Sequence, residues 1–216
     1  MHLYHLQQMG ITPYLLRKDQ LRSTTLKRLN QKINHCKRCS LHETRSQTVF
    51  ATGNTEAELM IIGPAPGQSE ELQGLPCVGA GRNLLNQILS AVGFNEQEVY
   101  LTNLIKCRPP HDRSPQQEEM SRCEDYLAQQ IATIKPRVLL ILGQLTAQFL
   151  LKTDESLEQM RNHLFEYQNI PLIVTYEPSY LILNPAIKKN AYQDWVKVVS
   201  AALKFEPLPE PSFTNL

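Results

Sequence analysis

The sequence lacks long hydrophobic runs, a signal-peptide pattern and a marked excess of either charge. No apolar stretch reaches the roughly 18 residues that a helix needs to cross a bilayer, and residues 1–10 lack a charged segment followed by an apolar one. The 22 basic and 21 acidic residues give a net charge of +1, so contacts with nucleic acid require local patches of charge. We therefore expect a cytoplasmic protein without a membrane segment.

Cysteine is scarce, with five residues in the chain. In a reducing compartment such cysteines indicate metal ligation or catalysis rather than disulfides. Cys36 and Cys39 form a closely spaced pair, and Cys107 and Cys123 form a second pair across a proline-rich loop. Four thiolates can hold a tetrahedral zinc ion or an iron–sulfur cubane, and their spacing does not choose between the two. Buried cysteines without a metal are the alternative, and we expect Cys77 to be a small packed residue.

The chain length of 216 residues and a hydrophobic content of 42% suit one compact α/β domain. The sequence contains no internal repeat and no low-complexity tract. We divide the chain into an N-terminal arm (1–20), a main domain (21–206) that opens with a basic helical stretch (21–35), and a proline-containing tail (207–216).

Apolar runs bounded by turn residues predict four buried parallel strands that alternate with helices. The strands are expected at 59–63, 99–103, 137–143 and 172–175, and the helices at 83–92, 116–134, 145–151 and 186–203. This alternation predicts an α/β fold with a three-layer doubly wound sheet that is mostly parallel. Ligands of such sheets bind beyond the carboxyl ends of the strands.

Four further runs follow one another along the main domain: Gly63-Pro64-Ala65-Pro66-Gly67, Leu72-Gln73-Gly74-Leu75-Pro76-Cys77-Val78-Gly79, Thr102-Asn103-Leu104-Ile105-Lys106-Cys107-Arg108-Pro109-Pro110 with Arg113-Ser114-Pro115, and Tyr176-Glu177-Pro178-Ser179-Tyr180-Leu181. In this order they closely resemble family 4 uracil-DNA glycosylases. The resemblance implies the uracil-DNA glycosylase-like fold and a [4Fe-4S] cluster on Cys36, Cys39, Cys107 and Cys123. Such a cluster would join the N-terminal segment to the middle of the domain and add its binding free energy to folding.

The resemblance also implies roles for two polar residues of a base pocket. Asn103 stands where the family has its base-reading asparagine, and Glu70 stands after the first motif, where it would position a water molecule. As alternatives, Asn103 satisfies loop backbone at the end of a strand, and Glu70 is a solvated loop residue.

Three positions depart from the family pattern and indicate a degenerate pocket. Pro64 replaces a glutamate of the first motif, and Cys77 replaces the aromatic residue that stacks on uracil, a contact worth roughly 1–3 kcal/mol. Glu177 replaces the histidine that faces the developing negative charge. An ionised carboxylate there would repel the anion by about 4 kcal/mol, and the lost donor would add about 3 kcal/mol, which together slow the reaction by about five powers of ten. A protonated Glu177 would still be a donor.

The N-terminal arm carries a second resemblance. A short run is similar to the N-terminal segment of the psi subunit of bacterial DNA polymerase III, which docks onto the clamp loader, while the rest of psi holds the chi subunit. An arm with several large apolar residues suits a peptide that orders on a partner; the alternative is that it packs on its own domain. The residues concerned are Leu6, Gln7, Gln8, Met9, Gly10, Ile11, Thr12, Tyr14, Leu15 and Leu16.

From these patterns we predict a non-catalytic, psi-like subunit that is stabilised by the cluster, docks the clamp loader through its arm and bridges to chi. The alternative is a family 4 uracil-DNA glycosylase of base excision repair with a divergent active site. A DNA-damage binder without catalysis lies between the two. Weak DNA binding would use basic side chains for phosphate contacts, although a solvated surface explains them equally well: Lys106, Arg108, Arg113 and Arg137.

Overall fold

The computed structural model describes residues 14–203, so residues 1–13 of the predicted arm and the whole predicted tail lie outside the described residues. The described chain is built around one six-stranded sheet with the order β1-β3-β2-β4-β6-β5. The four central strands are parallel, and β1 and β5 pair antiparallel at the two edges. The strands are β1 (Ala51–Gly53), β2 (Leu59–Gly63), β3 (Val99–Asn103), β4 (Val138–Leu142), β5 (Phe165–Tyr167) and β6 (Ile170–Thr175).

Helices connect the strands and cover both faces of the sheet. Within the described chain these are α2 (Tyr14–Asn34), α3 (Leu41–Thr44), α4 (Gln68–Gln73), α5 (Gly79–Ala91), α6 (Gln117–Ile134), α7 (Gln144–Leu151), α8 (Leu157–Met160), α9 (Pro178–Leu183) and α10 (Lys188–Leu203), with short 3-10 turns at Glu96–Glu98, Pro110–Asp112 and Pro185–Ile187.

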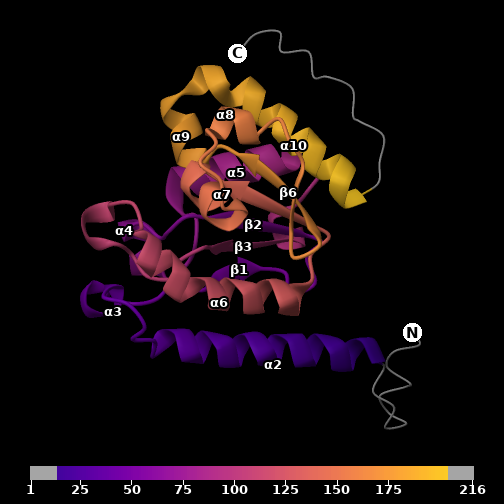
Figure 1. Ribbon diagram of the computed structural model, residues 1–216. Coiled ribbons are helices and arrows are strands. Elements are labelled where there is room, and N and C mark those ends of the chain that lie inside the picture. The colour runs from indigo at the N-terminus through magenta and orange to yellow at the C-terminus, as the bar shows by residue number, and fades with distance from the viewer. Residues whose placement is uncertain (1–13, 204–216) are drawn as a thin grey trace.

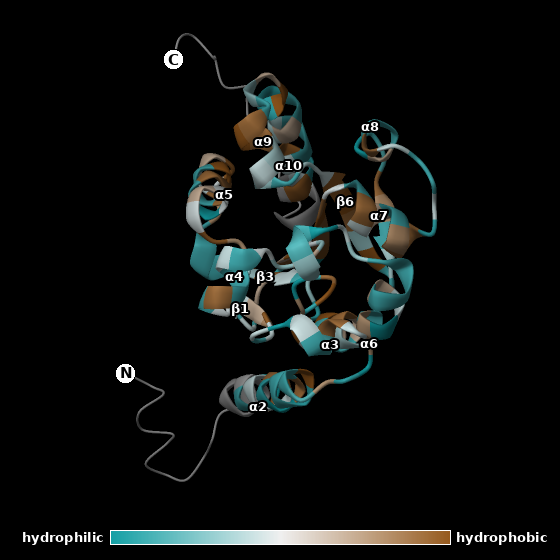
Figure 2. Ribbon diagram, turned by 90° about the vertical axis from the view of Figure 1, so that its left-hand side faces the viewer, coloured by the Kyte–Doolittle hydropathy of each residue, from teal (hydrophilic) through white to brown (hydrophobic). Residues whose placement is uncertain are grey.

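The core has two halves, one on each face of the sheet. On one face, Leu85 and Leu89 of α5 and Trp195 of α10 pack on the strands. On the other, Leu127 and Ile131 of α6 pack on the sheet together with apolar residues of α7. Figure 1 shows α5 and α10 above the sheet and α6 below it, with α2 lying along the outer side of α6. Helix α2 forms the edge of the molecule beside α3 and α6 in the view of Figure 2.

The observed architecture confirms the predicted three-layer, mostly parallel α/β fold. Strands β2 and β3 have the predicted bounds. Each is buried along its whole length, so its sequence is a mainly apolar run whose ends could be located. The prediction missed β1 and β5. Each has only three residues, none of them fully buried, so neither leaves an apolar run in the sequence. Helix α2 begins at Tyr14 and continues past residue 20, so the predicted border between arm and domain falls within one helix.

None of the described helices is long and apolar enough to cross a membrane.

Candidate active site at the carboxyl ends of the strands

A cleft lies beyond the carboxyl ends of the parallel strands. Strand β3 lies on one side of β2 in the sheet, and the next strand along the chain, β4, lies on the other side of β2. The direction in which strands are added to the sheet therefore reverses beside β2. Doubly wound sheets bind ligands at such a reversal. The ends of β2, β3 and β4 and the start of α9 line the cleft, whose volume is about 770 Å³. It brings together all five residues predicted for the base pocket: Pro64, Glu70, Cys77, Asn103 and Glu177.

Asn103 is the last residue of β3 and pairs in register with Gly63 of β2. A Cβ at Gly63 would lie 2.5 Å from Asn103 Oδ1, so the asparagine side chain requires a glycine on the neighbouring strand. The Asn103 side chain lines the cleft, is 5% exposed, and has no hydrogen-bond partner for its Nδ2 in the part of the chain that is described. An unsatisfied buried donor costs roughly 1–3 kcal/mol, which a ligand oxygen would restore.

Glu177 stands on the opposite side of the cleft, between β6 and the first residue of α9, Pro178. Its carboxyl fills the space that a side chain at Gly143 would need, and Gly143 directly follows β4 with a φ of +88°. Among the described residues, the Glu177 carboxyl has no hydrogen-bond or ion-pair partner. Burial, and to a smaller degree the charge of Glu70, raise the pKa of Glu177 to about 6. A substantial part of Glu177 is therefore protonated just below neutral pH.

Glu70 ties the start of α4 to the loop that carries Cys77. Its Oε2 accepts the Gly67 N–H at 2.8 Å, and its Oε1 accepts the Cys77 N–H. Burial raises the pKa of Glu70, while these two donors act in the opposite direction. Glu70 is thus not a solvated loop residue: both of its oxygens hold backbone in place.

Cys77 and Pro64 make the neighbouring walls of the cleft apolar. Cys77 has a left-handed backbone (φ 51°) and packs against the apolar cluster formed by α5 and the sheet. Burial raises the pKa of Cys77 to about 11, so the thiol is neutral at physiological pH. Pro64 has no N–H to offer a ligand, and its carbonyl accepts the Ile105 N–H at 3.2 Å. Neither residue supplies an aromatic face or a charge.

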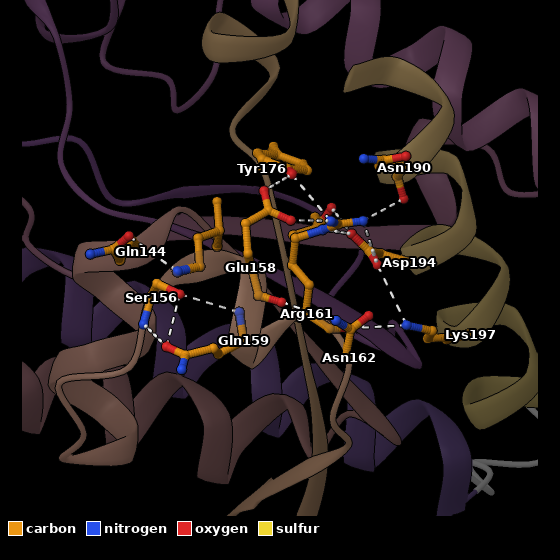
Figure 3. A network of polar contacts seen from close by, with 12 residues as sticks. Gln144, Ser156, Glu158, Gln159, Arg161, Asn162, Tyr176, Asn190, Asp194 and Lys197 are labelled. Carbon is orange, nitrogen blue, oxygen red and sulfur yellow. Dashed lines mark hydrogen bonds and ion pairs between the residues drawn. The ribbon is translucent and has the colours of Figure 1, made fainter. Parts of the chain in front are cut away.

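A buried polar network behind the cleft fixes the segment that carries Glu177 (Figure 3). Arg161, which is 5% exposed, donates from Nε to Asp194 Oδ2 at 2.7 Å and from a terminal nitrogen to the Tyr176 hydroxyl at 3.1 Å. Asp194 is 1% exposed and also accepts the Thr175 hydroxyl at 2.9 Å. Tyr176 in turn stacks on Tyr180 of α9, with ring centroids 5.7 Å apart. The network therefore joins α10, the end of β6 and α9 on either side of Glu177.

The sequence predicted Gly143 at the ligand-binding end of a strand but not its contact with Glu177. It missed two further contributors to this site. Asp112 lines the cleft from the loop after β3, and Arg161 acts from outside the cleft. Arg161 and its partner Asp194 are 33 residues apart, and no local pattern links them.

The four predicted ligand cysteines line one small cavity. Cys36 and Cys39 follow α2, Cys107 follows β3, and Cys123 lies on α6. Arg45 donates to Cys107 Sγ at 2.9 Å and to the Cys36 carbonyl at 2.8 Å, which places a positive charge beside the thiols.

The geometry around this cavity bears on the kind of metal it suits. Within the described chain, no three Cys, His, Asp or Glu side chains form a group that could hold a single metal ion. A tetrahedral zinc site requires ligand atoms that converge on one point about 2.3 Å away. The corners of a cubane carry one thiolate each, and four thiols border one shared cavity here, so this donor set fits a cluster.

The basic residues predicted for phosphate contact are all engaged within the protein. Lys106 is 1% exposed and donates to the Thr102 hydroxyl at 2.6 Å, so its predicted surface position is wrong. Arg108 pairs with Asp112, Arg113 with Glu119 and Arg137 with Glu58. Weak DNA binding stays a prediction, but Lys106 cannot contribute to it from the surface.

Comparison with known proteins identifies the family. The model of the uracil DNA glycosylase superfamily matches residues 50–198. The chain is 33% identical to a type-4 uracil-DNA glycosylase of Archaeoglobus fulgidus over 82% of this chain and 93% of the relative. It is 34% identical to one of Saccharolobus solfataricus (84% and 88% of the two chains) and 32% identical to one of Thermotoga maritima (72% and 82%). This chain belongs to the uracil-DNA glycosylase superfamily.

The relatives named as type-4 uracil-DNA glycosylases support the resemblance to family 4 and overturn the predicted function. The prediction of a non-catalytic psi-like subunit of the clamp loader is wrong, because relatives that match most of the chain are named as type-4 uracil-DNA glycosylases. The prediction rested on the acidic Glu177 in place of a donor and on a short run in the arm, and it gave these more weight than the match of the whole domain. Residues 6–12 of that arm lie outside the described residues, and the clamp-loader and chi partners stay a prediction.

Proposed function

We propose that this chain removes uracil from DNA as a glycosylase with a divergent active site, and that a [4Fe-4S] cluster on Cys36, Cys39, Cys107 and Cys123 stabilises its fold. The observation that carries the proposal is the buried, unpartnered amide of Asn103 in the cleft at the strand ends. A flipped base is read by hydrogen bonds to its edge, and the Asn103 Nδ2 is a free donor for a carbonyl oxygen of uracil.

Glu177 supplies the donor for the departing base when its carboxyl is protonated. Breaking the bond between C1′ and N1 puts negative charge on the uracil ring, and a protonated carboxyl donates a hydrogen bond to that charge. Because the pKa of Glu177 is about 6, protonating it at pH 7 costs about 1.4 kcal/mol. This cost is smaller than the repulsion of about 4 kcal/mol that an ionised carboxylate would exert. The glutamate that stands here in place of the family's histidine therefore shifts the reaction to lower pH and does not abolish it.

The cluster would be held where three segments meet. Cys36 and Cys39 tie the end of α2, and Cys107 and Cys123 tie the loop after β3 to α6. When bound, the cluster supplies cross-linking free energy that holds α2 against α6. Arg45 offsets part of the negative charge of the thiolates.

Uracil release from a single-stranded oligonucleotide with one uracil tests the proposal. The full-length protein is compared with Asn103→Ala and with Asn162→Ala, whose asparagine is exposed and bonds only to its own turn, from pH 5 to pH 8 under single-turnover conditions. We expect release by the wild type and by Asn162→Ala, and a loss of at least 100-fold for Asn103→Ala. No release by the wild type at any pH in this range would overturn the proposal.

A further inference from the structure

The charged groups that line the cleft are all acidic. They are the carboxyls of Glu70, Asp112 and Glu177, and no Lys, Arg or His of the described chain lines the cleft with them. Arg108 neutralises Asp112 from behind, with Nε 2.6 Å from Oδ1 and a terminal nitrogen 2.9 Å from Oδ2. Glu70 accepts two backbone N–H groups. Only the charge of Glu177 is left without compensation by any described residue.

An uncompensated carboxylate favours a ligand with a positive charge. With a pKa of about 6, Glu177 is about nine-tenths ionised at pH 7. Its attraction for a cation is stronger in a half-buried cleft than in bulk water, since the effective dielectric constant is lower there. Asn103 provides an independent sign of a ligand, because its buried Nδ2 still lacks an acceptor.

We propose that the cleft also accepts purine bases that carry a positive charge because a ring nitrogen is alkylated, and that the protein releases these bases from DNA. The inference rests on the proposed glycosylase function, because such a base has to be flipped into the same cleft. N7-methylguanine and N3-methyladenine are the simplest members of this class. Each keeps groups on the edge of the ring that can accept a hydrogen bond from Asn103.

The chemistry of such a base removes the need for an anion donor. The bond between C1′ and the ring nitrogen breaks, and its electron pair cancels the positive charge of the ring, so the base leaves neutral. Positive charge passes to C1′, where the Glu177 carboxylate attracts it as well. The oxygen of a water molecule forms the new bond to C1′, and the proton of that water passes to the Glu177 carboxylate and then to solvent.

The cleft also has the space for a two-ring base. Its volume of about 770 Å³ lies within the range of small-molecule sites. Cys77 places a small side chain on its wall, and the neighbouring Gly81 has no side chain. A Cβ at Gly81 would meet only the Cys77 Sγ at 3.8 Å, so neither residue crowds this part of the cleft.

DNA methylated with dimethyl sulfate tests the inference. Full-length protein is incubated with this DNA at pH 7.5, and the free N7-methylguanine and N3-methyladenine are measured by mass spectrometry against an incubation without protein, which records spontaneous loss. A uracil-containing oligonucleotide is measured in parallel at pH 5.5 and pH 7.5. The variants are Glu177→Gln, which removes the charge and keeps the size, and Glu166→Gln, which alters an exposed glutamate of β5.

We expect the wild type and Glu166→Gln to release methylated purines at least tenfold faster than the spontaneous rate. We expect Glu177→Gln to lose at least tenfold of that rate while its unfolding in urea at pH 7.5 stays cooperative. Release of uracil without release of methylated purines overturns this inference and leaves the proposed function standing. Release of methylated purines alone overturns uracil as a substrate. Equal methylpurine release by wild type and Glu177→Gln shows that the charge of Glu177 plays no part.

Discussion

The carboxyl of Glu177 occupies the place that a side chain at Gly143 would fill, just as the amide of Asn103 lies over Gly63. In both cases a polar residue lies over a glycine of the neighbouring parallel strand. Asn103 and Gly63 are the last residues of β3 and β2, and Glu177 and Gly143 come just after β6 and β4. The two strand pairs lie on either side of the point where the strand order reverses. The two glycines have no side chains, so they leave the space through which both polar groups reach the same cleft.

Gly143→Ala is expected to displace Glu177 and to strain the backbone. The new Cβ would overlap the carboxyl, and the φ of +88° at this position suits glycine. Strain of this kind costs about 1–3 kcal/mol, so the free energy of unfolding in urea should fall by that amount and uracil release should fall at least tenfold. Gly93→Ala is the matched control, because φ is +83° there and a Cβ meets nothing within 4 Å. If both variants lose the same activity, the contact with Glu177 does not matter.

Uracil release should rise as the pH falls toward 5.5. The donor is the protonated form of Glu177, which is abundant below its pKa of about 6 and falls about tenfold for each pH unit above it. Glu70 and Asp112 face the same cleft, but their oxygens are already held by backbone N–H groups and by Arg108. Glu177→Gln is a donor at every pH, so its rate should stay level from pH 5.5 to pH 8. A level profile for the wild type would remove Glu177 from the reaction.

The same carboxyl should make stability depend on pH. The pKa of Glu177 is about 6 in the folded protein, above the ordinary value of 4.5, so folding favours the protonated form. The stability that this proton provides is fully present below about pH 4.5 and is lost as the pH rises through about 6. The free energy of unfolding of Glu177→Gln is compared with that of the wild type at each pH. This difference should favour the variant by up to about 2 kcal/mol more at pH 7.5 than at pH 4.5. Urea titrations at the two pH values measure the difference, and an equal effect at both would contradict it.

The sequence predicted the central strands and the pocket residues because each leaves a local signal. Strands β2 and β3 are continuous apolar runs, and the predicted pocket residues stand directly at strand ends or in the loop after the first motif. Helices α4 and α9 were missed because each has only six residues, too few for the periodic pattern of apolar residues that indicates a helix. The sequence also predicted the sign of the charge at Glu177. Its raised pKa depends on burial and on Glu70, which only the folded chain brings near.

Arg161→Met should destabilise the protein strongly, because it removes the buried guanidinium that pairs with Asp194. The Asp194 carboxyl then keeps only the Thr175 hydroxyl and the more distant, partly exposed Lys197. Removing one member of a buried ion pair costs about 3–5 kcal/mol, and both side chains are almost fully buried here. The double variant Arg161→Met/Asp194→Leu should recover most of that loss, since it also removes the buried carboxylate, which Lys197 alone compensates only in part. Arg137→Met is the control, because its pair with Glu58 is exposed and should contribute less than about 1 kcal/mol. Additive losses in the double variant would mean that the two residues act independently.

Cys107→Ser should remove the cluster and the stability that depends on it. Cys107 is one of four thiols around a single cavity, and it is held by Arg45 at 2.9 Å. The purified wild type should be brown, with thiolate–iron absorption near about 400 nm, and the variant should lose this band and unfold at a lower temperature. Cys77→Ser is the matched control, because Cys77 lines the other cleft and should leave the band intact. If Cys107→Ser keeps the absorption, Cys107 is not a ligand of the cluster. If elemental analysis finds zinc instead of iron in the wild type, the four thiols bind zinc and not a cluster.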